Sequence, residues 1–138
     1  MASSMKKVIL ALALVLILIT RDDPVLRQVK QKYRQFIRSL PPQYSKIKRP
    51  VIITGTYARG DVGSNVNKGG EIYICLENSV NDAFHVLLHE LAHTTVREYD
   101  HSSGFWESFQ NLKSLAEQGG FYTSVGTKKY CGKEISDS

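Results

Sequence analysis

The chain has 138 residues, a length that suits one compact domain. Apolar residues make up 42% and charged residues 22%, and these proportions of a folded chain argue against intrinsic disorder. The net charge is +5, and nine basic residues lie between positions 21 and 49 against only two acidic ones. Two cysteines, Cys75 and Cys131, exclude a multi-disulfide framework and lack the spacing of a cysteine zinc site, although one disulfide between them stays open.

The amino terminus predicts contact with a membrane. Lys6 and Lys7 precede an unbroken apolar run from Val8 to Ile19. A spanning helix needs about 20 apolar residues, whereas the apolar part of a signal peptide needs about 7–15. Because no pair of small residues marks a cleavage site after the run, we predict that residues 1–23 form an uncleaved membrane anchor. A cleaved signal segment is the alternative, so the protein is expected to be membrane-anchored or exported, in an orientation that the sequence does not give.

A basic amphipathic helix is predicted next, from Pro24 to the pair Pro41-Pro42. Its apolar residues recur at helical spacing, and basic residues occupy much of the remaining surface. The apolar set is Val25, Leu26, Val29, Tyr33, Phe36, Ile37 and Leu40. Such a surface can face anionic lipid or nucleic acid, or simply be solvated. No nucleic-acid-binding motif accompanies it.

Two segments rich in β-branched residues, 51–57 and 71–77, predict strands. Residues 59–70 between them are rich in Gly and Asn and predict a loop. Ser79 then predicts the start of a helix, because its hydroxyl can cap the first turn and Asp82 occupies the capping-box position. This helix is expected to end near Glu98.

A second helix should follow a short turn at residues 100–102 and end at Gly119-Gly120. Its apolar stripe is Phe105, Trp106, Phe109, Leu112, Leu115 and Ala116. Residues 122–138 are polar without periodicity and predict a tail. We therefore expect an α+β fold, in which a domain at 24–121 combines an amphipathic helix, a small sheet and two further helices.

The helix that follows Ser79 carries the pattern H-E-x-x-H, with His89, Glu90 and His93. Positions i and i+4 share one face of a helix, so two imidazoles can converge on one zinc ion. Glu90 can then act as the general base toward a metal-activated water. A chain of this composition matches the pattern by chance in roughly 0.6% of cases. We predict His89 and His93 as zinc ligands and Glu90 as the catalytic residue.

A catalytic zinc site needs a third protein ligand. His101 is the leading candidate, because a chain reversal near Asp100 would return it toward the metal. Asp100, Glu107 and Glu117 are the alternatives, and Asp100 could instead orient a ligating imidazole. His85, one helical turn before the first ligand, is expected to line the site or the helix surface.

Residues 89–93 (H-E-L-A-H) and 100–106 (D-H-S-S-G-F-W) together resemble the WLM/SprT-like group of small zinc peptidases, and similar short proteins occur in large DNA viruses. The resemblance covers roughly residues 51–120 in the order of the elements. It implies a zincin-like fold, His101 as the third ligand, and packing of Phe105 and Trp106 under the site. It also implies that the strand before the zinc helix forms the rim of the cleft and pairs with an extended substrate.

The function predicted from these residues is zinc-dependent hydrolysis of peptide bonds in a protein or peptide substrate. Tyr73, Tyr99 and Tyr122 are each available to stabilise the oxyanion, and the sequence does not choose among them. Two other classes stay open. One is a zinc-binding module without activity, against which the intact Glu90 argues. The other is a basic module that associates with nucleic acid or with a membrane through residues 8–19.

Overall fold

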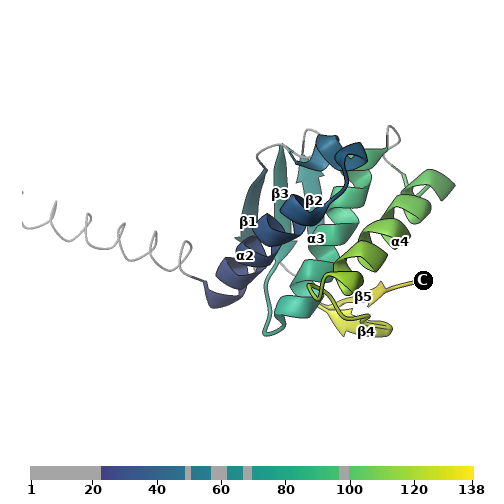
Figure 1. Cartoon of the computed structure of the whole chain (residues 1–138). Helices are drawn as coiled ribbons and strands as arrows, with labels where there is room; N and C mark the ends of the chain where they lie inside the picture. Colours follow the sequence, from purple (N-terminus) through teal and green to yellow (C-terminus); the bar gives the residue numbers. More distant parts are fainter. Residues whose placement is uncertain (1–22, 49–50, 57–61, 67–69, 97–99) are drawn as a thin grey trace, which may run out of the picture.

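The computed structural model describes residues 23–48, 51–56, 62–66, 70–96 and 100–138. They form a mixed α+β fold of three α-helices and two small sheets (Figure 1). The predicted membrane anchor lies almost entirely outside these residues, as does Tyr99. Within the described ranges, the helices are too short or too polar to span a membrane.

The helices are α2 (Pro24–Ser39), α3 (Val80–Thr95) and α4 (Ser103–Gln118), with a short 3₁₀ helix η1 (Pro42–Ile47). The strands are β1 (Ile52–Thr56), β2 (Gly63–Val66), β3 (Glu71–Cys75), β4 (Thr127–Tyr130) and β5 (Lys133–Ser136). The first sheet has the order β1-β3-β2, in which β3 is parallel to β1 and antiparallel to β2. The last two strands form an antiparallel hairpin.

Helix α2 confirms the amphipathic helix predicted from Pro24. The Asp23 side chain caps it by accepting a 3.0 Å hydrogen bond from the Leu26 N–H, and the chain leaves the helix at Leu40, before the two prolines. The buried face is Leu26, Val29, Tyr33 and Phe36, whereas several of the basic residues point to solvent. The Tyr33 hydroxyl donates to the Ile47 carbonyl and thereby fixes η1 against α2.

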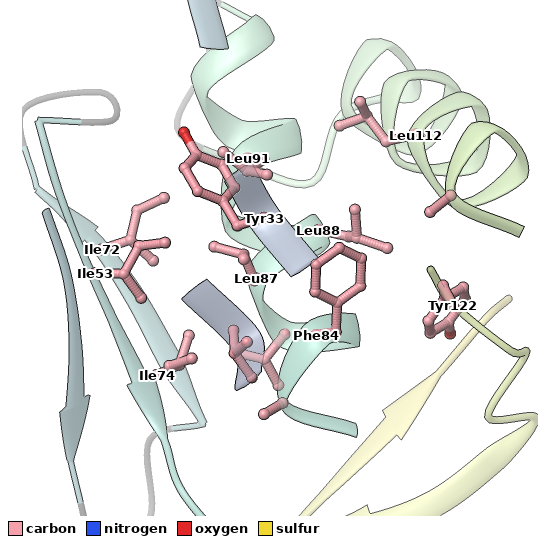
Figure 2. Packing of buried hydrophobic residues seen from close by; sticks show 14 of the residues in the cluster. Tyr33, Ile53, Ile72, Ile74, Phe84, Leu87, Leu88, Leu91, Leu112 and Tyr122 are labelled. Atoms are coloured by element: carbon pink, nitrogen blue, oxygen red, sulfur yellow. The ribbon is translucent and has the colours of Figure 1, made fainter. Parts of the chain in front are cut away.

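Helix α3 lies at the centre of the molecule, between the sheet and α4 (Figure 1). Isoleucines of the sheet reach it from one side, and Leu112 of α4 approaches from the other (Figure 2). Most α3 side chains are buried, as expected of a helix covered on several faces. Because the core packs around α3, side chains carried by α3 are held in well-defined positions.

Strand β2 was not predicted, and it corrects the expected rim of the cleft. Residues 63–66 (G-S-N-V) lie in the segment expected to be a loop, but they pair with residues 71–74 of β3. Strand β3 is therefore central, with β1 on one edge and β2 on the other, and its backbone cannot pair with a substrate. The edge strand beside α3 is β2.

The expected polar tail is a structured hairpin joined to the core. A disulfide links Cys75, at the end of β3, to Cys131, in the turn of the hairpin. The Tyr130 hydroxyl donates to the Cys75 carbonyl at 2.6 Å, and the Lys128 ammonium pairs with Asp82 of α3 at 2.7 Å. The disulfide left open by the sequence is therefore present, and it holds β4 and β5 against the ends of β3 and α3.

Candidate metal centre

Helix α3 presents His89 and His93 on the face that meets α4. The Ser79 hydroxyl caps this helix as predicted, by accepting from the Asp82 N–H at 3.1 Å. The two imidazole rings lie 5.0 Å apart between centroids, and both contact Phe105 of α4. The last turn of α3 is joined to α4 by a 2.5 Å hydrogen bond between the hydroxyls of Thr95 and Ser108.

His101 completes a group of three imidazoles. It directly precedes Ser102, whose hydroxyl caps α4 by accepting from the Phe105 N–H at 3.3 Å, so the start of α4 fixes its position. Its ring lies 5.1 Å from that of His89 and 5.0 Å from that of His93. The chain reversal expected near Asp100 therefore brings a third histidine to the two of α3.

The spacing of the donor atoms suits a metal ion. The Nε2 atoms of His89 and His101 are 3.2 Å apart, and one donor nitrogen from each of the three rings lies within 4.8 Å of the others. Two nitrogens bound tetrahedrally to zinc at ~2.0–2.1 Å are themselves ~3.3 Å apart. His89, His93 and His101 could thus hold a metal ion, while Asp100, Glu107 and Glu117 do not belong to the group.

Aromatic rings of α4 support these imidazoles. Phe105 is fully buried and stacks on His93 at 4.3 Å between centroids, and its distance to the other two imidazole rings is below 5 Å. The expectation that Phe105 packs under the site is therefore confirmed. Trp106 differs, because 37% of it is exposed and it lies at the edge of the site, 6.0 Å from His101.

Burial keeps the first histidine of the pattern neutral. Desolvation, followed by the nearby His93 and His101 rings, lowers the pKa of His89 to about 3. A neutral imidazole retains a lone pair at neutral pH, and this lone pair is what a metal ion requires.

The Glu90 side chain extends from α3 toward strand β2. It is only 6% exposed, and a Cβ atom added to Gly63 would lie 3.2 Å from its Oε1 and 2.6 Å from Val86 Cγ1. A glycine in β2 therefore makes room for the carboxylate. Asn65 fixes the strand there, since its Nδ2 donates to the Glu90 carbonyl at 2.7 Å and to the Thr94 hydroxyl at 2.8 Å.

His85 is buried beside the site and lines the adjoining cavity. Of the two positions expected for it, the one on the helix surface is therefore wrong. Its Nδ1 lies 2.8 Å from the Tyr122 hydroxyl, which donates to Asp137 Oδ1 at 2.5 Å. Burial lowers the pKa of His85 to about 4, and the charge of Lys113 adds to this, although the nearby charge of Asp137 acts in the opposite direction. Burial alone would raise the pKa of Asp137, but hydrogen bonds from Ser124, Tyr122 and the Gly126 N–H lower it to about 2.

Both described tyrosines considered for the oxyanion have carboxylate partners elsewhere. Tyr122 donates to Asp137 in the network behind His85, and Tyr73 donates to Glu71 at 2.6 Å within β3. Tyr99 lies outside the described residues. Neither Tyr73 nor Tyr122 directs its hydroxyl proton at the three imidazoles. The described residues therefore do not support either of them as the group that stabilises the oxyanion.

A cavity of about 180 Å³ adjoins His89, between α3, α4 and β5. Its lining consists of Val62, His85, Val86, His89, Trp106, Phe109, Glu134, Ile135 and Ser136. Sequence reasoning missed the last three residues, because nothing in the polar segment 122–138 indicates that it returns to the histidines. The only signal was Cys131, whose partner Cys75 stands directly before the segment that leads into α3.

Three comparisons were made, and none finds a match. They covered models of protein families, curated proteins and solved structures.

Proposed function

We propose that this protein is a zinc-dependent peptidase with a zincin-like site, in which His89, His93 and His101 hold the metal. The observation that carries the proposal is the convergence of these three imidazoles with Glu90 one residue after the first of them. Three imidazole nitrogens within 4.8 Å of one another suit zinc better than hard cations such as magnesium or calcium. Three protein ligands leave one position open, as catalytic zinc sites do.

Glu90 is the proposed general base. Zinc supplies a Lewis acid, which polarises a carbonyl and makes water a stronger acid. The carboxylate of Glu90 stands on the β2 side of the helix, where it can take the proton of the attacking water and later deliver it to the leaving amine. A module without activity would need neither the acid at this position nor the glycine that accommodates it.

Strand β2 is the proposed docking edge for the substrate backbone. It pairs with β3 on one side, and Asn65 holds it against α3 next to the Glu90 carbonyl. An extended peptide that pairs with the other edge of β2 would run past Glu90 and the metal ligands. Since main-chain hydrogen bonds carry no side-chain information, this docking would tolerate many sequences.

We propose that the protein lies at the surface of a membrane, on the side that faces an oxidising compartment, or that it is exported. The Cys75–Cys131 disulfide supports an oxidising compartment. The apolar run at residues 8–19 supports an anchor, and α2 follows it directly with exposed basic residues that can contact anionic headgroups.

The proposal is tested by incubating the purified protein with an unfolded protein substrate and measuring cleavage. We expect Glu90→Gln to reduce the rate about 10²- to 10⁴-fold while zinc stays bound. Glu107→Gln is the matched control, because Glu107 is an exposed glutamate of α4 outside the histidine group, and it should cleave normally. A zinc-loaded wild type that cleaves nothing would refute the peptidase function and leave a metal-binding module, whereas equal cleavage by wild type and Glu90→Gln would refute Glu90 as the general base.

A further inference from the structure

The cavity beside His89 has apolar walls and a polar inner end. Val62, Val86, Phe109 and Ile135 supply the walls. His85 is 3% exposed, whereas Trp106 and Glu134 are exposed, so the imidazole lies at the inner end and the other two lie at the mouth. The volume of about 180 Å³ is comparable with the ~150 Å³ of a protein cavity that binds benzene, so one aromatic side chain fits.

The hydrogen-bond network behind His85 decides which atom faces the cavity. The Asp137 carboxylate accepts a hydrogen bond from the Tyr122 hydroxyl on Oδ1 and hydrogen bonds from the Ser124 hydroxyl and the Gly126 N–H on Oδ2. Because the Tyr122 proton is directed at Asp137, the tyrosine oxygen accepts from His85 Nδ1. The proton of the neutral ring therefore sits on Nδ1, and Nε2 is left as a hydrogen-bond acceptor.

The network is held from both helices and from the hairpin. Lys113 of α4 donates to the Asp137 carbonyl at 2.6 Å and lies 3.4 Å from Oδ1, and Gln110 donates to the same carbonyl at 2.6 Å. Rotation of the Asp137 side chain would break its hydrogen bonds with Tyr122, Ser124 and the Gly126 N–H together. The tautomer of His85 is thus fixed by the fold and does not depend on a ligand.

We propose that this cavity binds a substrate side chain that flanks the scissile bond, and that it selects an aromatic ring with a neutral hydrogen-bond donor at its tip, such as the phenol of tyrosine. The ring would lie between the apolar walls, and the hydroxyl would donate to His85 Nε2. This inference rests on the proposed function, because the cavity matters to cleavage only if the reaction takes place at the adjoining histidines.

Two other side chains fit the cavity less well. A phenylalanine ring would fill the walls but would cover the His85 acceptor without pairing with it, which is costly for a buried polar atom. A lysine would bring its ammonium group to an inner end that offers a neutral ring and no carboxylate of its own, since Glu134 lies at the mouth. A buried acceptor of this kind therefore favours a phenol.

The first test compares peptides that differ only by Tyr, Phe or Lys at one position, after cleavage sites in an unfolded protein have shown which side of the bond is selected. We expect kcat/KM to be about tenfold higher for Tyr than for Phe. A separate readout that needs no turnover is binding of p-cresol and toluene, followed by NMR shifts of the Ile135 methyl groups. We expect p-cresol to bind more tightly.

Two variants of His85 assign the preference to one atom. In His85→Asn the side-chain amide can occupy the place of Nδ1 and keep the bond to Tyr122, but nothing replaces Nε2, so the preference for phenol should vanish. In His85→Gln the amide oxygen can reach the place of Nε2 and should restore part of it. Glu134→Gln is the control at the mouth and should keep the preference. Thermal unfolding of each variant checks that it is folded.

The outcomes separate the inference from the proposed function. Cleavage without a preference for Tyr, a preference that survives in His85→Asn, or a preference for Lys that is lost in Glu134→Gln would each overturn the inference and leave the peptidase intact. Tighter binding of p-cresol that depends on His85, in a protein that cleaves nothing, would support the phenol site and refute the peptidase. Equal binding of p-cresol and toluene would overturn the phenol site directly.

Discussion

Loss of the Cys75–Cys131 disulfide should destabilise the protein strongly. The two cysteines are 56 residues apart in the sequence, so the bond closes a long loop in the unfolded chain. The chain-entropy relation gives a stabilisation of about 4 kcal/mol for a loop of this length. Because small domains are stable by only about 5–15 kcal/mol, the loss would remove a large part of the total.

The measurement is urea unfolding of the oxidised protein, of the same protein after reduction, and of the variant with both cysteines replaced by alanine. Reduction keeps both sulfur atoms and removes only the cross-link, so it isolates the loop effect. The double variant should lose somewhat more, since both side chains are buried and their replacement also removes packing contacts. Metal content must be equal in all samples, because a bound metal itself stabilises the folded state.

The result that would refute this reasoning is an unchanged urea midpoint after reduction. Two free thiols in the unfolded, unreduced protein would refute it more directly, since the hairpin would then lack its covalent link to β3. In that case the wall of the cavity formed by Glu134, Ile135 and Ser136 would have no covalent fixation.

Three further predictions concern single side chains. Gly63→Ala places a Cβ atom 2.6 Å from Val86 and 3.2 Å from the Glu90 carboxylate, so we expect kcat to fall about tenfold or more with unchanged zinc content; normal turnover would contradict the position of the base. Phe105→Ala removes a fully buried ring under the three imidazoles and should cost about 3–5 kcal/mol in the free energy of unfolding, measured by denaturant titration, and weaken zinc binding; unchanged stability and zinc affinity would contradict its supporting role. The folded pKa of Asp137 is about 2, below its unfolded value near 3.8, so its stabilisation is present above about pH 4 and is lost as the pH falls toward 2. Discounted for its partial exposure this is about 1–2 kcal/mol, and Asp137→Asn should flatten that part of the stability–pH curve, whereas an unchanged curve would show that the network does not hold the charge.

The helices and the candidate metal ligands were predictable because their signals are local. The capping serine, the helical spacing of apolar residues and the pattern H-E-x-x-H all lie within a few turns of α3. His101 was also within reach, because only a short turn separates it from His93. These features depend on periodicity and chain reversal, which the sequence displays directly.

The edge strand and the hairpin could not be predicted because they depend on distant partners. Strand β2 has no apolar alternation, and it is a strand because it pairs with β3 and because Asn65 bonds to α3. The position of His85 depends on Tyr122, which is 37 residues away. An imidazole on a helix gives no sign of such a partner, so the tertiary contact alone explains why His85 is buried.

The most direct test of the central claim is the zinc content of the purified full-length protein, measured by elemental analysis beside His101→Ala. We predict one zinc per chain in the wild type and its loss in the variant, with both proteins folded. A folded wild-type protein that takes up no zinc, or a variant that retains it fully, would contradict the three-histidine site on which the proposed function depends.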